Sequence, residues 1–223
     1  MKKAVVLYSG GLDSTTVLYW AIQKGYRVTA LTLDYGQLHR KEVHLAVREM
    51  KRMKIRHYLL KVAFPWKGSA LLDKKISIPV DREEKQMTSE IPATYVPARN
   101  TVFLAHAASC AEATGAEAIC IGANAIDYSG YPDCRPEFMK SFERVMDTGT
   151  KSGVQGKKIK ILTPLIRLSK ASIIRLGKSL GVRYERTWSC YQGKSKPCLV
   201  CDSCKLRLKG FHEAGLKDPL VKV

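Results

Sequence analysis

A glycine-rich hexapeptide near the start of the chain has the composition of a phosphate-binding turn. It reads SGGLDS over residues 9–14 and directly follows the apolar run AVVLY at residues 4–8. Adjacent glycines let the backbone approach an anion, and the first amides of a following helix supply hydrogen-bond donors. The hexapeptide lacks the spacing of both a Walker loop and a dinucleotide loop. It therefore predicts a phosphate site of another type, the alternative being an ordinary turn before a serine-capped helix.

Four cysteines near the other end of the chain have the spacing of metal ligands. The pattern is Cys190-x7-Cys198-x2-Cys201-x2-Cys204. Two successive C-x-x-C turns aim their sulfurs at one centre, and tetrahedral zinc suits four thiolates. An iron–sulfur cluster is a competing interpretation, but the C-x3-C-P that completes a ferredoxin run is missing. Unliganded buried thiols are the third alternative. We expect a structural zinc site, because four sulfurs leave no coordination position open.

A third group of residues suits a planar, polar heterocycle. The tyrosines of this group can stack on a ring, and its carboxylates can accept hydrogen bonds from an amidine-like pair of N–H groups. The alternative is a loop of solvated acids with tyrosines packed on the core. Cys134 lies in the same stretch, but nothing nearby would lower its pKa, so we predict no nucleophilic role for it. The candidates for substrate contact are Arg99, Asn100, Asp127, Tyr128, Tyr131, Asp133 and Glu137.

Apolar and amphipathic segments alternate along the chain in the rhythm of an α/β fold. Strands are expected near 3–8, 28–34, 57–62, 117–123 and 159–163, and helices near 14–24, 40–53, 99–114, from 136 onward and 169–180. This order predicts a Rossmann-like parallel sheet with helices on both faces. We expect Asp13 or Ser14 to cap the first helix, Gly25 to end it, and Asp202 or Ser203 to cap a final helix. Because parallel strands end on one rim, the glycine loop and residues 124–135 should meet there.

Length and charge set limits on the class of protein. With 223 residues, the chain fits a domain over 1–187 and a small zinc-binding module over 188–223. A formal net charge of +18 suits nucleotides or nucleic acid, but the basic residues form no long run, so we do not expect direct binding of nucleic acid. No apolar stretch suits a signal peptide or a membrane span. Crowded cysteines favour reduced thiols and a cytoplasmic protein. Residues 65–94 are polar and irregular, which predicts a lid or a partner surface.

Together these motifs resemble the 7-cyano-7-deazaguanine synthase family of the PP-loop, or N-type ATP pyrophosphatase, superfamily. The hexapeptide at 9–14 is similar to the superfamily signature SGGxDS. The narrower resemblance extends over nearly the whole chain and departs from the commoner pattern at Ala98, where glycine is expected. No match covers residues 65–94. The segments that carry the narrower resemblance are 97–100, 127–135, Pro164-Leu165 with Lys170, and the four cysteines.

The resemblance implies an adenine nucleotide alpha hydrolase-like fold and an ATP-dependent carbon–nitrogen ligase. Its reaction would convert 7-carboxy-7-deazaguanine and ammonia to 7-cyano-7-deazaguanine through adenylated carboxylate and amide intermediates, with Mg²⁺ and Zn²⁺ as metals. Catalytic roles are implied for Lys170 toward the phosphates, for Arg99 toward the substrate carboxylate or the pyrophosphate, and for Asp13, which would help to hold the metal or cap the helix. The residues expected at the nucleotide are Tyr8, Ser9, Gly10, Gly11, Leu12, Asp13, Ser14, Thr15, Thr16, Val17, Leu18 and Leu33.

Two other functions are compatible with the same residues. A PP-loop enzyme that adenylates and modifies tRNA directly would use the high net charge, although we find no separate RNA-binding region. A zinc-stapled nucleotide-binding module without catalysis is the second alternative. The family resemblance also implies a homodimer, and free ammonium is the expected nitrogen donor, because the remaining residues cannot hold a glutaminase domain.

Overall fold

A five-stranded parallel sheet forms the centre of the protein. The computed structural model describes residues 1–83, 86–87, 90–126 and 131–221. The strand order is β3-β2-β1-β4-β5, and Val5 of β1 lies opposite Thr29 of β2 and Ile119 of β4. The expected α/β class with a parallel sheet is confirmed. The strands are β1 (Lys3–Leu7), β2 (Arg27–Asp34), β3 (Arg56–Lys61), β4 (Ala118–Cys120) and β5 (Lys160–Leu162).

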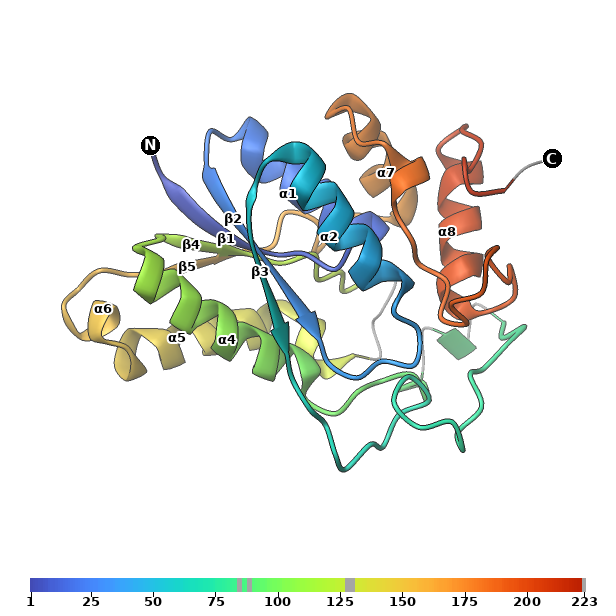
Figure 1. Cartoon of the computed structure of the whole chain (residues 1–223), viewed down its shortest axis with the longest axis horizontal. Helices are drawn as coiled ribbons and strands as arrows, with labels where there is room; N and C mark the ends of the chain where they lie inside the picture. Colours follow the sequence, from blue (N-terminus) through green and yellow to red (C-terminus); the bar gives the residue numbers. More distant parts are fainter. Residues whose placement is uncertain (84–85, 88–89, 127–130, 222–223) are drawn as a thin grey trace.

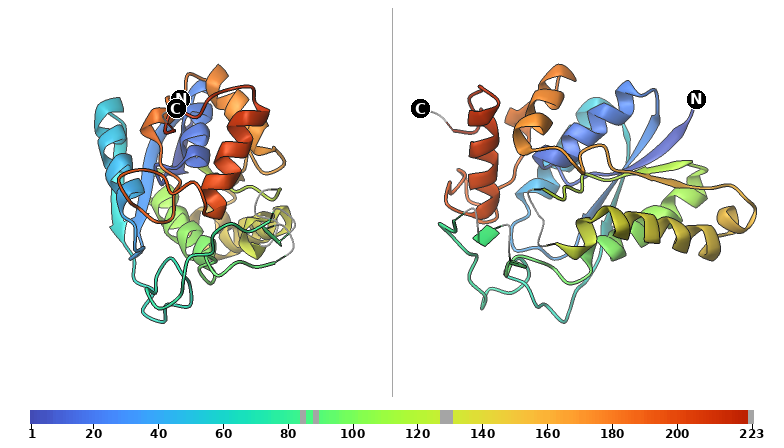
Figure 2. Two further views of the ribbon diagram at one scale, coloured as in Figure 1. Left: turned by 90° about the vertical axis from the view of Figure 1, so that its right-hand side faces the viewer. Right: turned by 180° about the vertical axis from the view of Figure 1, so that it is seen from behind.

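Helices cover both faces of this sheet (Figure 1). Helices α1 (Leu12–Gln23), α2 (Lys41–Met53) and α7 (Lys170–Ser179) lie on one face. On the other face lie α4 (Arg99–Thr114), α5 (Pro136–Gly149) and the short α6 (Lys151–Val154). Helix α8 (Asp202–Glu213) lies beside α7 at the end of the molecule near the carboxyl ends of the strands (Figure 2). Among the residues that the structure describes, no helix combines the length and apolar character needed to cross a membrane.

The alternation of side chains along β1 gives each face its own core. Ala4, Val6 and Tyr8 belong to a buried cluster with residues of α1, α2 and α7. Val5 and Leu7 point the other way, into a second buried cluster with residues of α4 and α5. A strand covered on both faces has no solvent side, which explains why this run is apolar at every position.

The ends of the helices follow the expected signals only in part. Gly25 follows the last residues of α1 with a φ of +79°, in the left-handed conformation that glycine favours. The predicted caps at the start of α1 are wrong, because Gly11 is the N-cap and Ser14 lies in the first turn. The hydroxyl of Ser14 instead accepts a hydrogen bond from the amide of Ser9 at 3.2 Å, which shapes the glycine loop. Cys201 is likewise the N-cap of α8, one residue before the predicted candidates.

The described part of residues 65–94 lies at the end of the molecule that holds α8 and braces the start of that helix (Figure 1). Val80 pairs with Cys201 in an antiparallel bridge. The guanidinium of Arg82 donates to the carboxylate of Asp202 at 2.9 Å, and the ammonium of Lys205 donates to the carbonyl of Arg82 at 2.7 Å. The described part of this segment is therefore a structural support for the cysteine region.

Candidate functional site

A cavity of about 220 Å³ opens where β1 and β4 end side by side. This is the point at which the strand order reverses direction, where open α/β sheets bind their ligands. The glycine loop, α2, the start of α4 and the cysteine region all contribute to its lining. The predicted meeting of the glycine loop with the segment after β4 is confirmed, because Ser9, Gly11 and Asn124 line the same cavity.

Two glycines allow the close approaches that build this corner. Gly10 has a φ of +86°, and a Cβ atom there would lie 2.6 Å from the carbonyl oxygen of Glu42. A Cβ atom on Gly122, just beyond β4, would lie 3.1 Å from the amide nitrogen of Ser14. The amide of Gly11 donates to the hydroxyl of Ser9 at 3.2 Å. The first amides of α1 have no partners within the helix, so this end of α1 offers donors to an anion.

A buried ion pair links the glycine loop to α7. The ammonium of Lys170 lies 2.8 Å from both carboxylate oxygens of Asp13, and the two side chains are only 8% and 20% exposed. Ser169 fixes the start of α7, because its hydroxyl accepts the amide of Ser172 at 3.2 Å. Both Lys170 and Asp13 line the cavity, so this edge of it carries a paired cation and anion.

A second cation faces the cavity from the first turn of α4. Arg99 has its guanidinium 5.7 Å from the ring centroid of Phe103 and 6.0 Å from that of Tyr35. Its buried Nε has no hydrogen-bond partner among the residues that the structure describes. Ala98, the N-cap of α4, has a φ of +52°, in the region that glycine favours. This geometry explains why glycine is expected at that position, because a positive φ is unfavourable for alanine.

The residues predicted for the nucleotide divide between the cavity and the protein behind it. Thr15 and Thr16 donate their hydroxyls back to the carbonyls of Gly11 and Leu12 at 2.7 and 2.9 Å. Val17 and Leu18 are fully buried in the core, and Gly10 faces the backbone of α2 and does not line the cavity. The members that line the cavity are Tyr8, Ser9, Gly11, Leu12, Asp13, Ser14 and Leu33.

The residues predicted for the substrate are also divided. Asn100 and Tyr131 line the cavity together with Arg99. Asp133 is buried beside it, where its carboxylate accepts the backbone amide of Asn100 at 2.9 Å, so it supports the start of α4. Glu137 is exposed on α5 and does not line the cavity. The remaining two candidates, Asp127 and Tyr128, lie outside the described residues.

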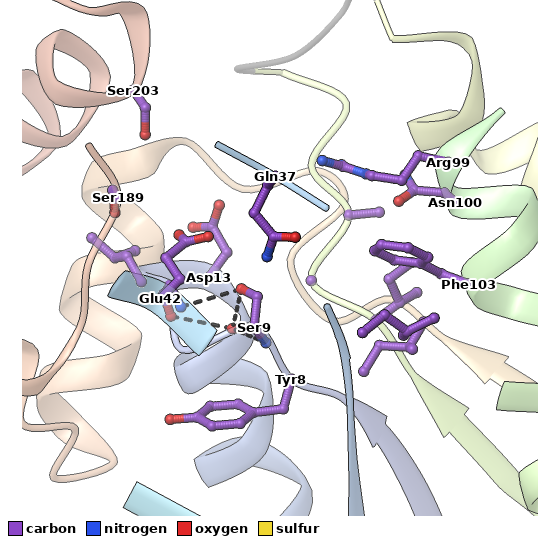
Figure 3. Close-up of a pocket in the computed structure, with 18 of the residues that line it drawn as sticks. Tyr8, Ser9, Asp13, Gln37, Glu42, Arg99, Asn100, Phe103, Ser189 and Ser203 are labelled. Atoms are coloured by element: carbon purple, nitrogen blue, oxygen red, sulfur yellow. Dashed lines mark hydrogen bonds between the residues drawn. The ribbon is translucent and has the colours of Figure 1, made fainter. Parts of the chain in front are cut away.

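Several polar lining residues were not predicted from the sequence, and Gln37 and Glu42 are the two that lie beside the glycine loop. Gln37 and Glu42 follow the carboxyl end of β2, and both point into the cavity from beside the glycine loop (Figure 3). Neither belongs to a motif. The sequence could have indicated them only by their position after a central parallel strand, because residues there lie at the same edge of the sheet as the glycine loop.

The four predicted cysteines come together at the start of α8. Their sulfur atoms all lie within 4.8 Å of one another, and those of Cys198 and Cys204 are 3.9 Å apart. A tetrahedron with metal–sulfur bonds of ~2.3 Å has edges of about 3.8 Å, so the cluster has the dimensions of a metal site. None of the seven cysteines forms a disulfide, and Cys110, Cys120 and Cys134 lie apart from the cluster.

The cysteine region also forms one wall of the cavity. The amide of Trp188 donates to the carbonyl of Gly10 at 3.1 Å, and its indole N–H donates to the carbonyl of Cys190 at 2.9 Å. Trp188 therefore joins the glycine loop to the first cysteine. The lining residues from this region are Ser189, Tyr191, Ser203 and Arg207.

Comparisons with known proteins identify the family of the chain. Residues 3–215 match the family described as "Queuosine biosynthesis protein QueC". Proteins named 7-cyano-7-deazaguanine synthase are similar over almost their full length. That of Trichodesmium erythraeum is 50% identical over 98% of this chain and 100% of its own, and that of Thermoplasma volcanium is 52% identical over 98% and 90%. A solved structure of NMN synthetase from Francisella tularensis has a TM-score of 0.48 at 17% identity, over 97% of this chain and 88% of its own. The chain belongs to the QueC family.

Proposed function

We propose that the protein converts 7-carboxy-7-deazaguanine and ammonia to 7-cyano-7-deazaguanine at the expense of ATP. The observation that carries the proposal is one shared cavity, where a glycine loop at a helix start, the Lys170–Asp13 pair and Arg99 meet in a chain of the QueC family. The relatives that carry the name of this activity are about half identical to the chain over its whole length.

The reaction explains why a phosphate-binding loop is needed. A carboxylate is a poor electrophile, because oxide or hydroxide would have to leave. Attack of this carboxylate on the α-phosphate of ATP gives an acyl adenylate and pyrophosphate, and ammonia then displaces AMP to form the amide. A second adenylation on the amide oxygen, followed by loss of AMP, gives the nitrile. Both halves use the same phosphate chemistry, so one cavity can serve twice.

The residues divide the work by charge. The first amides of α1 and the glycine loop would bind the phosphates, and Lys170 would stabilise the charge that develops on them. The ion pair with Lys170 uses both oxygens of Asp13, so Asp13 orients the lysine. Arg99 would hold the substrate carboxylate or the pyrophosphate through its guanidinium fork. Leu33 would border the adenine, and Asn100 and Tyr131 the heterocycle.

The metals have separate roles in this proposal. Four thiolates with the spacing observed suit Zn²⁺, which would be structural because no coordination position is left open. Mg²⁺ carried by the triphosphate would neutralise charge on the leaving pyrophosphate. The division into a catalytic domain over 1–187 and a metal module over 188–223, the homodimer and free ammonia as the nitrogen donor remain proposals. The reduced thiols of the metal cluster favour a cytoplasmic location.

Mass spectrometry of a complete reaction tests the function. The mixture contains purified protein, 7-carboxy-7-deazaguanine, ammonium, Mg²⁺ and ATP, and both the heterocycle and the adenine nucleotides are followed. We expect the nitrile together with AMP. Nitrile with ADP would keep the function and overturn adenylation. No nitrile would contradict the proposal and favour an enzyme that modifies tRNA directly, whose tRNA binding should weaken steeply with salt.

A further inference from the structure

One carboxylate in the cavity has no protein partner. Glu42 lies in the first turn of α2, and its side chain lies beside Ser9 and Asp13 at the glycine loop (Figure 3). Within the described part of the chain, no hydrogen bond or ion pair joins its carboxyl group to another residue. The nearby Asp13, in contrast, has both oxygens bonded to Lys170. The two acids at the loop therefore differ, because only Asp13 is neutralised.

The backbone holds Glu42 against the loop at close range. A Cβ atom on Gly11 would lie 3.1 Å from a carboxyl oxygen of Glu42, and one on Gly10 would lie 2.6 Å from its carbonyl oxygen. At Gly10 only glycine fits, because the contact is with the backbone and φ is +86°; at Gly11 a side chain would push the carboxyl group of Glu42 aside. A carboxyl group this near to a phosphate-binding loop lies within reach of an acyl adenylate formed there.

The proposed reaction needs a proton acceptor at that place twice. Ammonia that attacks the acyl adenylate becomes an ammonium group, which must lose a proton before AMP leaves. The adenylated amide must lose protons from nitrogen before the carbon–nitrogen triple bond forms. Neither Lys170 nor Arg99 can accept these protons while each is a cation.

We propose that Glu42 is the general base of this cavity, the residue that takes the proton from nitrogen in amide formation and again in nitrile formation. The inference rests on the proposed function. In the first half, Glu42 enters as the carboxylate, the C–N bond forms, the C–O bond to AMP breaks, and one ammonium proton passes to Glu42. In the second half, the C–O bond to AMP breaks as the triple bond forms, one nitrogen proton passes to Glu42 and the other to solvent. Between the halves, Glu42 returns its proton to departing pyrophosphate.

The electrostatic surroundings fit a group that changes protonation state. The pKa of Glu42 is raised from 4.5 to about 8, chiefly by burial; Arg99 across the cavity opposes this rise, and Asp13 and Cys190 add to it. The other titratable groups that line the cavity are Tyr8, Tyr35, His39, Tyr131, Cys134, Lys170, Tyr191 and Arg207. A general base works best when its pKa lies near the operating pH.

The test uses Glu42→Gln, which keeps the size and shape of the side chain and removes the base. Adenylation is measured separately from the steps that transfer a proton from nitrogen, amide formation and nitrile formation. Adenylation is measured as substrate-dependent exchange of labelled pyrophosphate into ATP, and the nitrogen steps as nitrile formed at a fixed concentration of free ammonia. We expect exchange to stay within about tenfold of wild type, while nitrile formation falls by about 10²- to 10⁴-fold. Hydroxylamine, which loses its proton more readily than ammonia does, should trap the accumulated acyl adenylate as a hydroxamate.

Every other outcome decides against the inference. Equal losses of exchange and nitrile formation would place Glu42 in ATP binding, and unchanged nitrile formation would remove it from the reaction. Two results in the wild-type protein are separate from this inference: absence of exchange would contradict the proposed adenylation, and absence of nitrile would contradict the proposed function. Glu117→Gln is the matched control, because Glu117 is an exposed acid at the opposite end of the sheet. Thermal unfolding of each variant shows whether it folds.

Discussion

Substitution of Gly210 by alanine should damage catalysis from outside the cavity. Gly210 lies on α8, where a Cβ atom would be 2.4 Å from Cγ and 2.8 Å from Cβ of Lys170, and 3.0 Å from a methyl group of Ile174. To reach ordinary van der Waals contact at 3.4 Å, Lys170 must retreat by about 1 Å or α8 must move away. Either response disturbs the ammonium that now lies 2.8 Å from Asp13.

The size of the effect follows from these distances. Overpacking of a buried contact costs roughly 1–3 kcal/mol in the free energy of unfolding. A displacement of ~1 Å at a catalytic group can lower turnover by about 10²-fold. Urea denaturation measures the first quantity, and the rate of nitrile formation at saturating substrates measures the second. Gly149→Ala is the matched control, because nothing lies within 4 Å of its added methyl group. If Gly210→Ala were destabilised but fully active, the present position of the Lys170 ammonium would not be required for turnover.

Three further changes test other parts of the structure. Lys170→Ala should abolish turnover while Lys178→Ala, exposed on the same helix, should not; equal activity of the two variants would refute the role of Lys170. Removal of the metal by a chelator should lower the melting temperature and weaken ATP binding, both restored by Zn²⁺, because Trp188 joins the cysteine cluster to the glycine loop. Burial raises the pKa of Glu42 from 4.5 to about 8, so ionising it destabilises the folded state as the pH rises through this range. Glu42→Gln should therefore gain stability relative to wild type above about pH 8 and show little difference below pH 4.5, which urea denaturation at both extremes would check.

The fold was predictable because its signals are local. The apolar run of β1 and the glycine after α1 are each contained in a few residues, and the structure has both where the pattern indicates. The strand expected over 117–123 is shorter, Ala118–Cys120. After Cys120 the chain passes close to the start of α1, where Gly122 lies against Ser14, and no local sequence pattern contains this contact.

The site was predictable only where its residues form motifs. The glycine loop and the cysteines could be found from their spacing alone. The sequence does not show whether the side chain of a single acidic residue faces the cavity. Asp133 lies turned toward the amide of Asn100 and Glu137 lies outside the cavity, although both belong to the same acidic stretch. Glu42 belongs to no motif and yet has the least partnered carboxylate beside the loop.

A cysteine module that only stabilised the C-terminal segment would not need to contact the glycine loop. Here Trp188 bonds to Gly10 of the loop, and Gly210 of α8 packs on Lys170, the partner of Asp13. Both contacts come from segments that follow the sheet in the chain and lie at its carboxyl rim. The cysteine cluster therefore lies next to two sides of the cavity, and we expect loss of the proposed metal to disturb ATP binding before the parallel sheet unfolds.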